Sequence, residues 1–163
     1  MKAAVLYFSR TGNTKRMAGV IAEGMRSVGA VEAEIFALDA IDEAFVKESR
    51  CVVVGTPTYL ATMAAQVKVW LDQPNPGLGL AGKIGGAFAT QDYLHGGGDI
   101  AVQAVLAHLM VKGMLTYSGG GARGKPVIHL GPVALKDSLT DADETFRIYG
   151  QRMAEMAVQV FGE

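Results

Sequence analysis

The segment of this 163-residue chain whose residue types are best suited to bind a ligand is Ser9-Arg10-Thr11-Gly12-Asn13-Thr14. Three hydroxyls and one amide surround a single glycine, between a short apolar run and a helical pattern. Such donors, together with the unpaired N–H groups at the start of a helix, can surround a phosphate dianion. One hydroxyl would suffice for an N-cap without a ligand. The number of donors therefore predicts binding of a phosphomonoester.

Two other glycine-rich segments match the dinucleotide pattern G-x-G-x-x-G, at residues 77–82 and 119–124. A lysine follows each of them, but Ile84 and Pro126 stand where a P-loop needs Ser or Thr for magnesium. Both segments also run into strand-like sequence, whereas a phosphate loop must open a helix. We therefore interpret neither segment as a Rossmann or P-loop site.

Few other residues have the type and the surroundings that catalysis or metal binding would need. Cys51 is the only cysteine, which excludes an intrachain disulfide, and it opens an apolar run. We therefore expect it to be a buried thiol rather than a nucleophile. His108 and His129 lie in apolar patterns and are expected to be structural. No spacing of His, Cys and carboxylate residues indicates a metal site.

Strand-like and helical patterns alternate along the chain. We predict strands over residues 3–8, 31–38, 51–55 and 84–89, and a last strand that begins at 114–117 and resumes at 126–130. We predict helices over residues 14–28, 41–47, 63–71 and 99–112, the last with Asp99 as its N-cap, and a final helix that opens with a capping box, Thr140-x-x-Asp143.

This alternation indicates an α/β fold, a three-layer sandwich in which a parallel sheet has helices on both faces. Right-handed crossovers leave a doubly wound topology, and five strands favour the order 2-1-3-4-5. No linker of different composition interrupts the pattern, so we expect a single domain over residues 1–163.

Composition and charge exclude several classes of protein. The 21 glycines have no period of three, which excludes a collagen-like chain. A net charge of -1 gives no general attraction to nucleic acid or anionic membranes. No apolar stretch reaches the ~18 residues of a membrane-spanning helix, and the N-terminal apolar run is too short for a signal peptide. We therefore expect a cytoplasmic protein with no membrane span and no nucleic-acid partner.

The pattern S-x-T-G-N-T after a first buried strand resembles the FMN-phosphate loop of the flavodoxins. The resemblance continues through Gly55-Thr56-Pro57-Thr58-Tyr59, Trp70-Leu71-Asp72-Gln73 and the triple glycine at 96–98. This second set is similar to the flavodoxin-like NAD(P)H:quinone oxidoreductases once described as tryptophan-repressor-binding proteins. The resemblance implies a flavodoxin-like fold with FMN as cofactor, nearest to those quinone oxidoreductases.

The resemblance also implies roles for three loops. The first would hold the FMN phosphate, and the loops after the third and fourth strands would flank the isoalloxazine ring. Tyr59 would stack on the ring, and Tyr93 is a second candidate for stacking. All three loops leave carboxyl ends of strands near the switch point of the sheet. The implied cofactor-binding residues are Ser9, Arg10, Thr11, Gly12, Asn13, Thr14, Thr56, Pro57, Thr58, Tyr59, Thr90, Gln91, Asp92, Tyr93, His95, Gly96, Gly97 and Gly98.

The function favoured by the sequence is an FMN-dependent NAD(P)H oxidoreductase, in which NADH or NADPH reduces the flavin and a quinone-like acceptor takes the electrons. His95 would then be a catalytic residue that protonates the reduced quinone. Arg123 and Lys125, in a glycine loop expected to be flexible, would bind a dinucleotide phosphate. The near-neutral charge and the basic residues expected around the flavin favour this function.

Other functions stay open. The alternative is a flavodoxin-type electron-transfer carrier that docks on redox protein partners, and a third is a flavin-free binding domain that kept the fold. The chain lacks the extra sequence that the quinone oxidoreductases carry after the second and fifth strands. It also has Val111-Lys112 where they have a histidine pair. Whether the chain forms a homodimer is left open.

Overall fold

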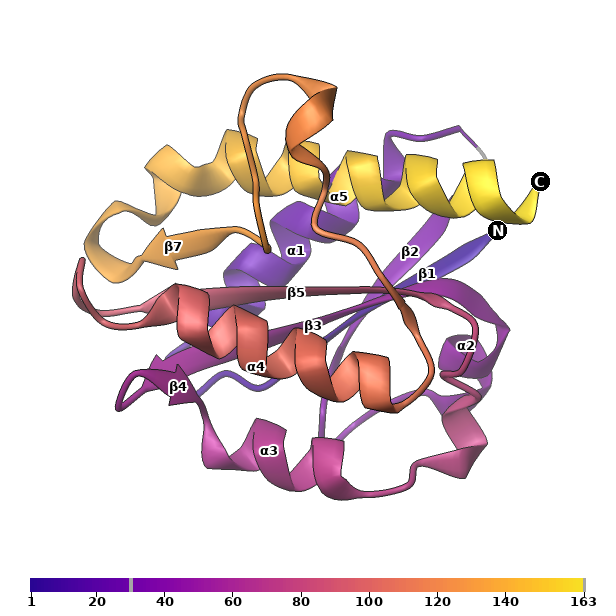
Figure 1. Cartoon of the computed structure of the whole chain (residues 1–163), viewed down its shortest axis with the longest axis horizontal. Helices are drawn as coiled ribbons and strands as arrows, with labels where there is room; N and C mark the ends of the chain where they lie inside the picture. Colours follow the sequence, from indigo (N-terminus) through magenta and orange to yellow (C-terminus); the bar gives the residue numbers. More distant parts are fainter. Residues whose placement is uncertain (30, 163) are drawn as a thin grey trace.

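The computed structural model describes residues 1–29 and 31–162 of the chain, as a parallel sheet with helices on both faces (Figure 1). The strand order is β2-β1-β3-β5-β6, and β7 extends β6 along the same edge of β5. This confirms the predicted order 2-1-3-4-5. The strands are β1 (Lys2–Tyr7), β2 (Glu32–Ala37), β3 (Ser49–Tyr59), β4 (Thr62–Met63), β5 (Ile84–Gln91), β6 (Leu115–Thr116) and β7 (Val133–Leu135).

Two groups of helices cover the two faces of the sheet. Their bounds are α1 (Asn13–Arg26), α2 (Glu43–Glu48), α3 (Ala65–Asp72), α4 (Gly98–Val111) and α5 (Leu139–Phe161), with short 3-10 turns η1 (Pro76–Leu78), η2 (Gly121–Arg123) and η3 (Lys136–Ser138). Helices α1 and α5 pack on one face, and α2, α3 and α4 pack on the other. None of the helices within residues 1–29 and 31–162 is long and apolar enough to cross a membrane.

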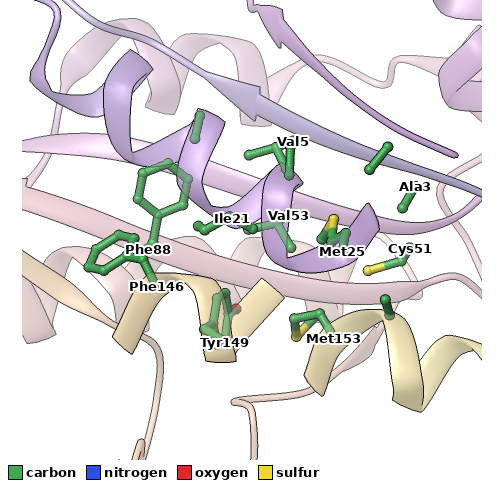
Figure 2. Packing of buried hydrophobic residues seen from close by; sticks show 14 of the residues in the cluster. Ala3, Val5, Ile21, Met25, Cys51, Val53, Phe88, Phe146, Tyr149 and Met153 are labelled. Atoms are coloured by element: carbon green, nitrogen blue, oxygen red, sulfur yellow. The ribbon is translucent and has the colours of Figure 1, made fainter. Parts of the chain in front are cut away.

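The apolar run of β1 is divided between two cores because side chains alternate across a strand. Ala3, Val5 and Tyr7 face α1 and α5, whereas Ala4 and Leu6 face the opposite layer. Figure 2 shows the first core, where side chains of β1, β3 and β5 meet those of α1 and α5. Cys51 lies in this core, and its burial raises the pKa of the thiol to about 12. This confirms the prediction of a buried thiol.

The fifth strand of the sheet is split in two. β6 pairs with the beginning of β5, at Ile84 and Gly85, and β7 pairs with its end, from Ala89 to Gln91. Residues 117–132 leave the sheet between these pairings, so the predicted resumption of the strand at 126–130 is wrong. The strand resumes at β7 instead, so this edge of the sheet ends at Leu135, directly before Lys136.

Arg152 of α5 holds the loop 117–132 in place. This side chain is buried, and its guanidinium donates hydrogen bonds to six main-chain carbonyls. The shortest of these bonds, 2.8 Å, reaches Pro126. The rigid fork of donors on an arginine suits several carbonyls at once. The glycine loop that was expected to be flexible is therefore tied to α5 at several points of its main chain.

Two predicted helix caps are also wrong. α4 begins at Gly98, with Gly97 at the N-cap, so Asp99 lies within the first turn. No side chain caps α5. The carboxylate of Asp143, expected in a capping box, accepts two hydrogen bonds of 2.7 Å from the guanidinium of Arg16. At Asp143, a long-range partner therefore replaces the local contact that the sequence pattern indicated.

Helices α1 and α5 cross at unusually short range, because each contributes a glycine to the crossing. A Cβ atom at Gly24 would lie 2.0 Å from the carbonyl oxygen of Arg147, and one at Gly150 would lie 2.1 Å from that of Ile21. By contrast, a Cβ atom at Gly19, also in α1, would meet nothing within 4 Å. The close approach of the two helices therefore depends on Gly24 and not on Gly19.

We expect Gly24→Ala to lower the free energy of unfolding by about 1–3 kcal/mol, because the backbones of α1 and α5 must move apart. The matched variant Gly19→Ala should raise it by about 0.5–1 kcal/mol, because alanine favours a helix and nothing obstructs its methyl group. Urea denaturation of both variants measures the two changes. Changes of the same sign would contradict this account of the helix crossing.

Candidate functional site

The first loop of the site, residues 8–14, connects β1 to α1 at the carboxyl edge of the sheet. Gly12, with φ +95°, precedes the helix, and its N–H group donates to Ser9 Oγ at 3.1 Å. No side chain caps the helix. The N–H groups of the first turn, which have no partner within a helix, are therefore left without a capping side chain beside Thr11 and Asn13. This is the arrangement that an anion requires.

The second loop follows β3, where two threonines have different surroundings. Thr56 is fully buried; its hydroxyl donates to the carbonyl of Pro57 and accepts from the N–H of Ala64. The hydroxyl of Thr56 therefore holds the loop, and cofactor binding by Thr56 stays a prediction that its main chain would have to fulfil. The hydroxyl of Thr58 is buried but has no hydrogen-bond partner in the described part of the chain. A buried polar group of this kind indicates a missing ligand or water.

Beyond Thr58, the chain turns back to form a hairpin with β4. The turn residues Leu60 and Ala61 have φ values of 49° and 65°, which non-glycine residues rarely adopt. Leu60 is completely exposed, and Tyr59 is 39% exposed. Gly97, which precedes α4, approaches the turn so closely that a Cβ atom there would lie 2.7 Å from Ala61 Cα. The loops after β3 and β5 therefore lie side by side.

The third loop, after β5, is tied to the first. The buried hydroxyls of Thr90 and Thr14 are 2.8 Å apart and share a hydrogen bond. Gln91 Oε1 accepts a hydrogen bond of 2.8 Å from the N–H of Gly98, which fixes the end of the loop at α4. Tyr93 and Leu94 project outward and are mostly exposed. Side-chain hydrogen bonds therefore fix both ends of this loop and leave its apolar tip accessible.

The three loops enclose a polar hollow of about 90 Å³. Its volume is below the ~300–1,000 Å³ of typical ligand pockets, so it would take one end of a nucleotide. Lys136, which the sequence analysis missed, lines it from the turn after β7 and lies 3.9 Å from the carboxylate of Asp92. The hollow is lined by Arg10, Thr11, Asn13, Thr14, Pro57, Thr58, Tyr59, Thr90, Gln91, Asp92 and Lys136.

The remaining predicted site residues lie outside this lining. Ser9 and Gly12 shape the first loop, and residues 96–98 join the third loop to α4. Tyr93 and His95 are exposed on the third loop.

The two residues predicted to bind a dinucleotide are not brought to the hollow. Arg123 forms a 2.7 Å ion pair with Glu155 and a hydrogen bond with Gln159, both in the second half of α5. The carbonyl of Lys125 is held by Arg152. Figure 1 places this η2 region over α5, away from the end of the sheet where β4 and the loop after β5 lie.

A larger open groove of about 750 Å³ lies on the other side of the first loop. Its walls include Phe8, Leu38, Val69 and Trp70, and its rim carries Lys15 and other polar residues. The groove is mainly apolar and lacks the array of hydroxyl donors. The smaller hollow therefore suits a phosphate better than the larger groove.

Comparison with known proteins identifies one family, whose model covers the first two loops of the site and the beginning of the third. A family model described as Flavodoxin matches residues 5–93. A flavodoxin from Clostridium saccharobutylicum is 45% identical over 161 residues, which cover 99% of this chain and 100% of the relative. Among solved structures, a flavodoxin from the domain Archaea has a TM-score of 0.78 and 25% identity, covering 96% of this chain and 99% of that one.

Quinone dehydrogenases are also relatives, at lower identity. An NAD(P)H dehydrogenase (quinone) from Paraburkholderia phymatum is 32% identical, with 99% of each chain covered. That alignment spans 199 residues, against the 163 of this chain, so the relative carries segments that this chain lacks. A WrbA-like flavodoxin from Agrobacterium tumefaciens has a TM-score of 0.81 and 27% identity, covering 97% of this chain and 98% of that one. The expected nearness to the quinone oxidoreductases is not supported, since the clostridial flavodoxin is more similar.

Proposed function

Because the chain belongs to the flavodoxin family, we propose that it is an FMN-binding electron carrier that docks on redox protein partners. The observation that carries this proposal is the convergence of three loops on a hollow that combines the uncapped start of α1 with a Thr58 hydroxyl that has no partner among the described residues. Their tips, Tyr59 and Leu60 on one side and Tyr93 and Leu94 on the other, are exposed. The sequence favoured an NAD(P)H oxidoreductase and left the electron carrier as the alternative; we now propose the carrier.

The residues of the hollow fit the phosphate end of FMN. The uncapped start of α1 supplies N–H donors and the positive end of a helix dipole. Thr58 lines the hollow, and a polar atom of the ligand would supply the hydrogen-bond partner that its hydroxyl lacks among the described residues. Arg10 and Lys136 add positive charge, which would offset a phosphate dianion. The fit supports FMN as the cofactor.

FMN, when bound, supplies reversible electron transfer; the chain supplies binding, orientation and solvent exclusion. The hydroxyl of Thr11 and the amide of Asn13 would hold the phosphate, and the hydroxyl of Thr58 lies in the same hollow. The ring of Tyr59 would cover one face of the flavin. The hydrogen bond between Thr14 and Thr90 would keep the first and third loops at a fixed separation. No acid or base is required of the protein for electron transfer.

Two observations support a carrier over a reductase. The clostridial flavodoxin matches this chain from end to end at 45% identity, whereas the quinone dehydrogenases carry segments that are absent here. The four exposed apolar side chains at the loop tips, Tyr59, Leu60, Tyr93 and Leu94, also form a rim that suits contact with a protein. Both observations favour electron exchange across a protein surface.

An NAD(P)H-dependent quinone reductase is the second candidate function. The identity with the quinone dehydrogenases favours it, as do Arg10 and Lys136, which could attract an anionic dinucleotide. His95 lies on the exposed third loop, where it could approach an acceptor. Because Arg123 forms an ion pair with Glu155, we assign it no role in dinucleotide binding.

Anaerobic titration of the FMN-loaded protein with NADH and NADPH separates the two functions. A carrier should keep its oxidised flavin absorbance, because it takes its electrons from a protein partner and not from a dinucleotide. After chemical reduction, the same sample should pass electrons to cytochrome c, used as a generic protein acceptor. Rapid bleaching by either nucleotide, with turnover when benzoquinone is added, would overturn the carrier and favour the reductase. Purified protein that fails to take up FMN would exclude both.

A further inference from the structure

The fold places the side chain of Lys136 at the hollow through the pairing of two strands. β7 pairs in parallel with the end of β5, and this register sets Leu135 beside Gln91. Lys136 and Asp92 follow these two residues directly, at the end of the sheet where Figure 1 shows β7 next to the loop after β5. Lys136 also begins the short turn η3, which leads into α5. The sheet and a long helix therefore fix the main chain of this lysine at the hollow.

The ammonium of Lys136 is attracted to Asp92 but is not hydrogen-bonded to it. Its Nζ lies 3.9 Å from Asp92 Oδ2, beyond the ~2.7–3.2 Å of a hydrogen bond. By contrast, the ammonium groups of Lys2 and Lys68 lie 2.7 Å and 2.5 Å from their carboxylate partners. No acceptor in the described part of the chain receives a hydrogen bond from Lys136. Its N–H donors therefore remain available to a ligand.

We propose that Lys136 is the side chain through which the hollow recognises the phosphate of its ligand, and that Asp92 competes with the phosphate for the ammonium. This inference rests on the proposed binding of FMN. The start of α1 and the hydroxyl of Thr58 offer polar partners in the hollow, but neither carries a formal charge. A hydrogen bond between two charged groups is stronger than one between neutral groups. Lys136 would therefore favour a phosphorylated flavin over an unphosphorylated one.

Arg10 is the other cation of the lining, but the position of its side chain is less restricted. It belongs to the first loop, it is exposed, and it also lines an open groove beside α3 and α4. Within residues 1–29 and 31–162, its guanidinium has no ion pair or hydrogen bond. A long side chain that is free to turn away loses more conformational entropy on binding than one that is already held near the ligand. We therefore assign phosphate recognition to Lys136, which Asp92 keeps near the hollow.

The carboxylate of Asp92 makes the proposal testable in two directions. The side chains of Lys136 and Asp92 are 53% and 60% exposed, so their pair stabilises the fold little and can be given up to a ligand. Once a phosphate is present, Asp92 is a second anion beside the same cation, and the two anions repel each other. Loss of the lysine charge should therefore weaken phosphate binding, whereas loss of the aspartate charge should strengthen it.

Fluorescence titration of the full chain with FMN and with riboflavin tests the proposal. Lys136→Met should weaken FMN binding about 10-fold in low salt and change riboflavin binding less than about twofold, because riboflavin has no phosphate. Lys136→Arg keeps the charge and should retain most of the FMN affinity. Asp92→Asn should strengthen FMN binding about threefold. The effect of Lys136→Met should shrink in ~0.5 M NaCl, because salt screens exposed charges.

The matched control is Lys15→Met. Lys15 is an exposed lysine in the first turn of α1, and it lines the larger groove rather than the hollow. A direct contact predicts that Lys15→Met weakens FMN binding much less than Lys136→Met does, and circular dichroism verifies that each variant is folded. Equal weakening by the two substitutions would indicate a general effect of net charge and would overturn the role of Lys136.

Inorganic phosphate provides a measurement that does not depend on the flavin. Phosphate should raise the melting temperature of the flavin-free full chain, because a ligand that binds the folded state stabilises it. The rise should be smaller in Lys136→Met and larger in Asp92→Asn, and an equal rise in all three proteins would overturn the proposal. Wild-type protein that does not take up FMN would overturn the proposed function itself. Wild-type FMN binding that Lys136→Met retains in full would overturn only the role of Lys136.

Discussion

Replacing Thr11 and Asn13 together by alanine is expected to weaken FMN binding about 100-fold or more and to leave riboflavin binding nearly unchanged. A hydrogen bond to a charged group contributes about 1.5–3 kcal/mol, and each 1.4 kcal/mol is a tenfold change in affinity. Both side chains line the hollow, and neither has another hydrogen-bond partner in the described part of the chain. Their loss therefore removes contacts with the phosphate and leaves the fold intact.

Riboflavin is the internal control of this experiment because it carries the ring and the ribityl chain but no phosphate. Quenching of flavin fluorescence measures both affinities on the same protein. Thr62→Ala is the matched variant, since Thr62 is an exposed threonine at the same edge but lies outside the hollow. Thr14 is unsuitable, because its loss would leave the buried hydroxyl of Thr90 without its partner. Equal weakening of FMN and riboflavin would contradict a phosphate site at these residues.

Replacing Arg152 by methionine is expected to lower the free energy of unfolding by about 3 kcal/mol. Leaving a buried acceptor without its donor costs about 1–3 kcal/mol; six carbonyls lose the guanidinium, and water at the loop surface recovers part of this loss. At about 2–4 °C per kcal/mol for a chain of this size, the melting temperature should fall by roughly 6–12 °C. Thermal unfolding monitored by circular dichroism measures the change.

Arg123→Met is the matched control for this prediction. It removes the ion pair with Glu155, whose two side chains are each 33% exposed. Partly exposed pairs contribute less than about 1 kcal/mol, so this variant should melt close to wild type. FMN affinity should survive in both variants, because the loop 117–132 is held over α5, away from the hollow. Similar melting temperatures for the two variants would show that Arg152 does not anchor the loop as described.

The positions of the first loop and of the strands that carry the site could be predicted from the sequence. Apolar runs such as that of β1 are local signals, because a strand buried on both faces needs apolar side chains on both. The clustering of hydroxyls at Ser9 to Thr14, directly after such a run, is also local. Helical spacing from Met17 to Met25 places that cluster at the start of α1.

Other features depend on residues far apart in the sequence, and local patterns predicted them wrongly. Asp143 has the spacing of a capping box but binds Arg16 of another helix. The glycines of the 117–132 loop indicated mobility, yet Arg152, many residues further along, holds their carbonyls. In both cases a long arginine side chain offers stronger hydrogen bonds than the local alternative.

The sequence by itself determined the order of the elements, the parallel sheet and the place of the phosphate loop, because these follow from periodicity and from the types of adjacent residues. Only the tertiary structure decided which threonine hydroxyl lacks a partner: that of Thr56 is satisfied by its own loop, whereas the buried hydroxyl of Thr58 has no hydrogen-bond partner among the described residues. It also brought Lys136 to the hollow by splitting the last strand. Whether a polar group has a partner depends on segments that meet only in the folded chain, and no local pattern records that meeting.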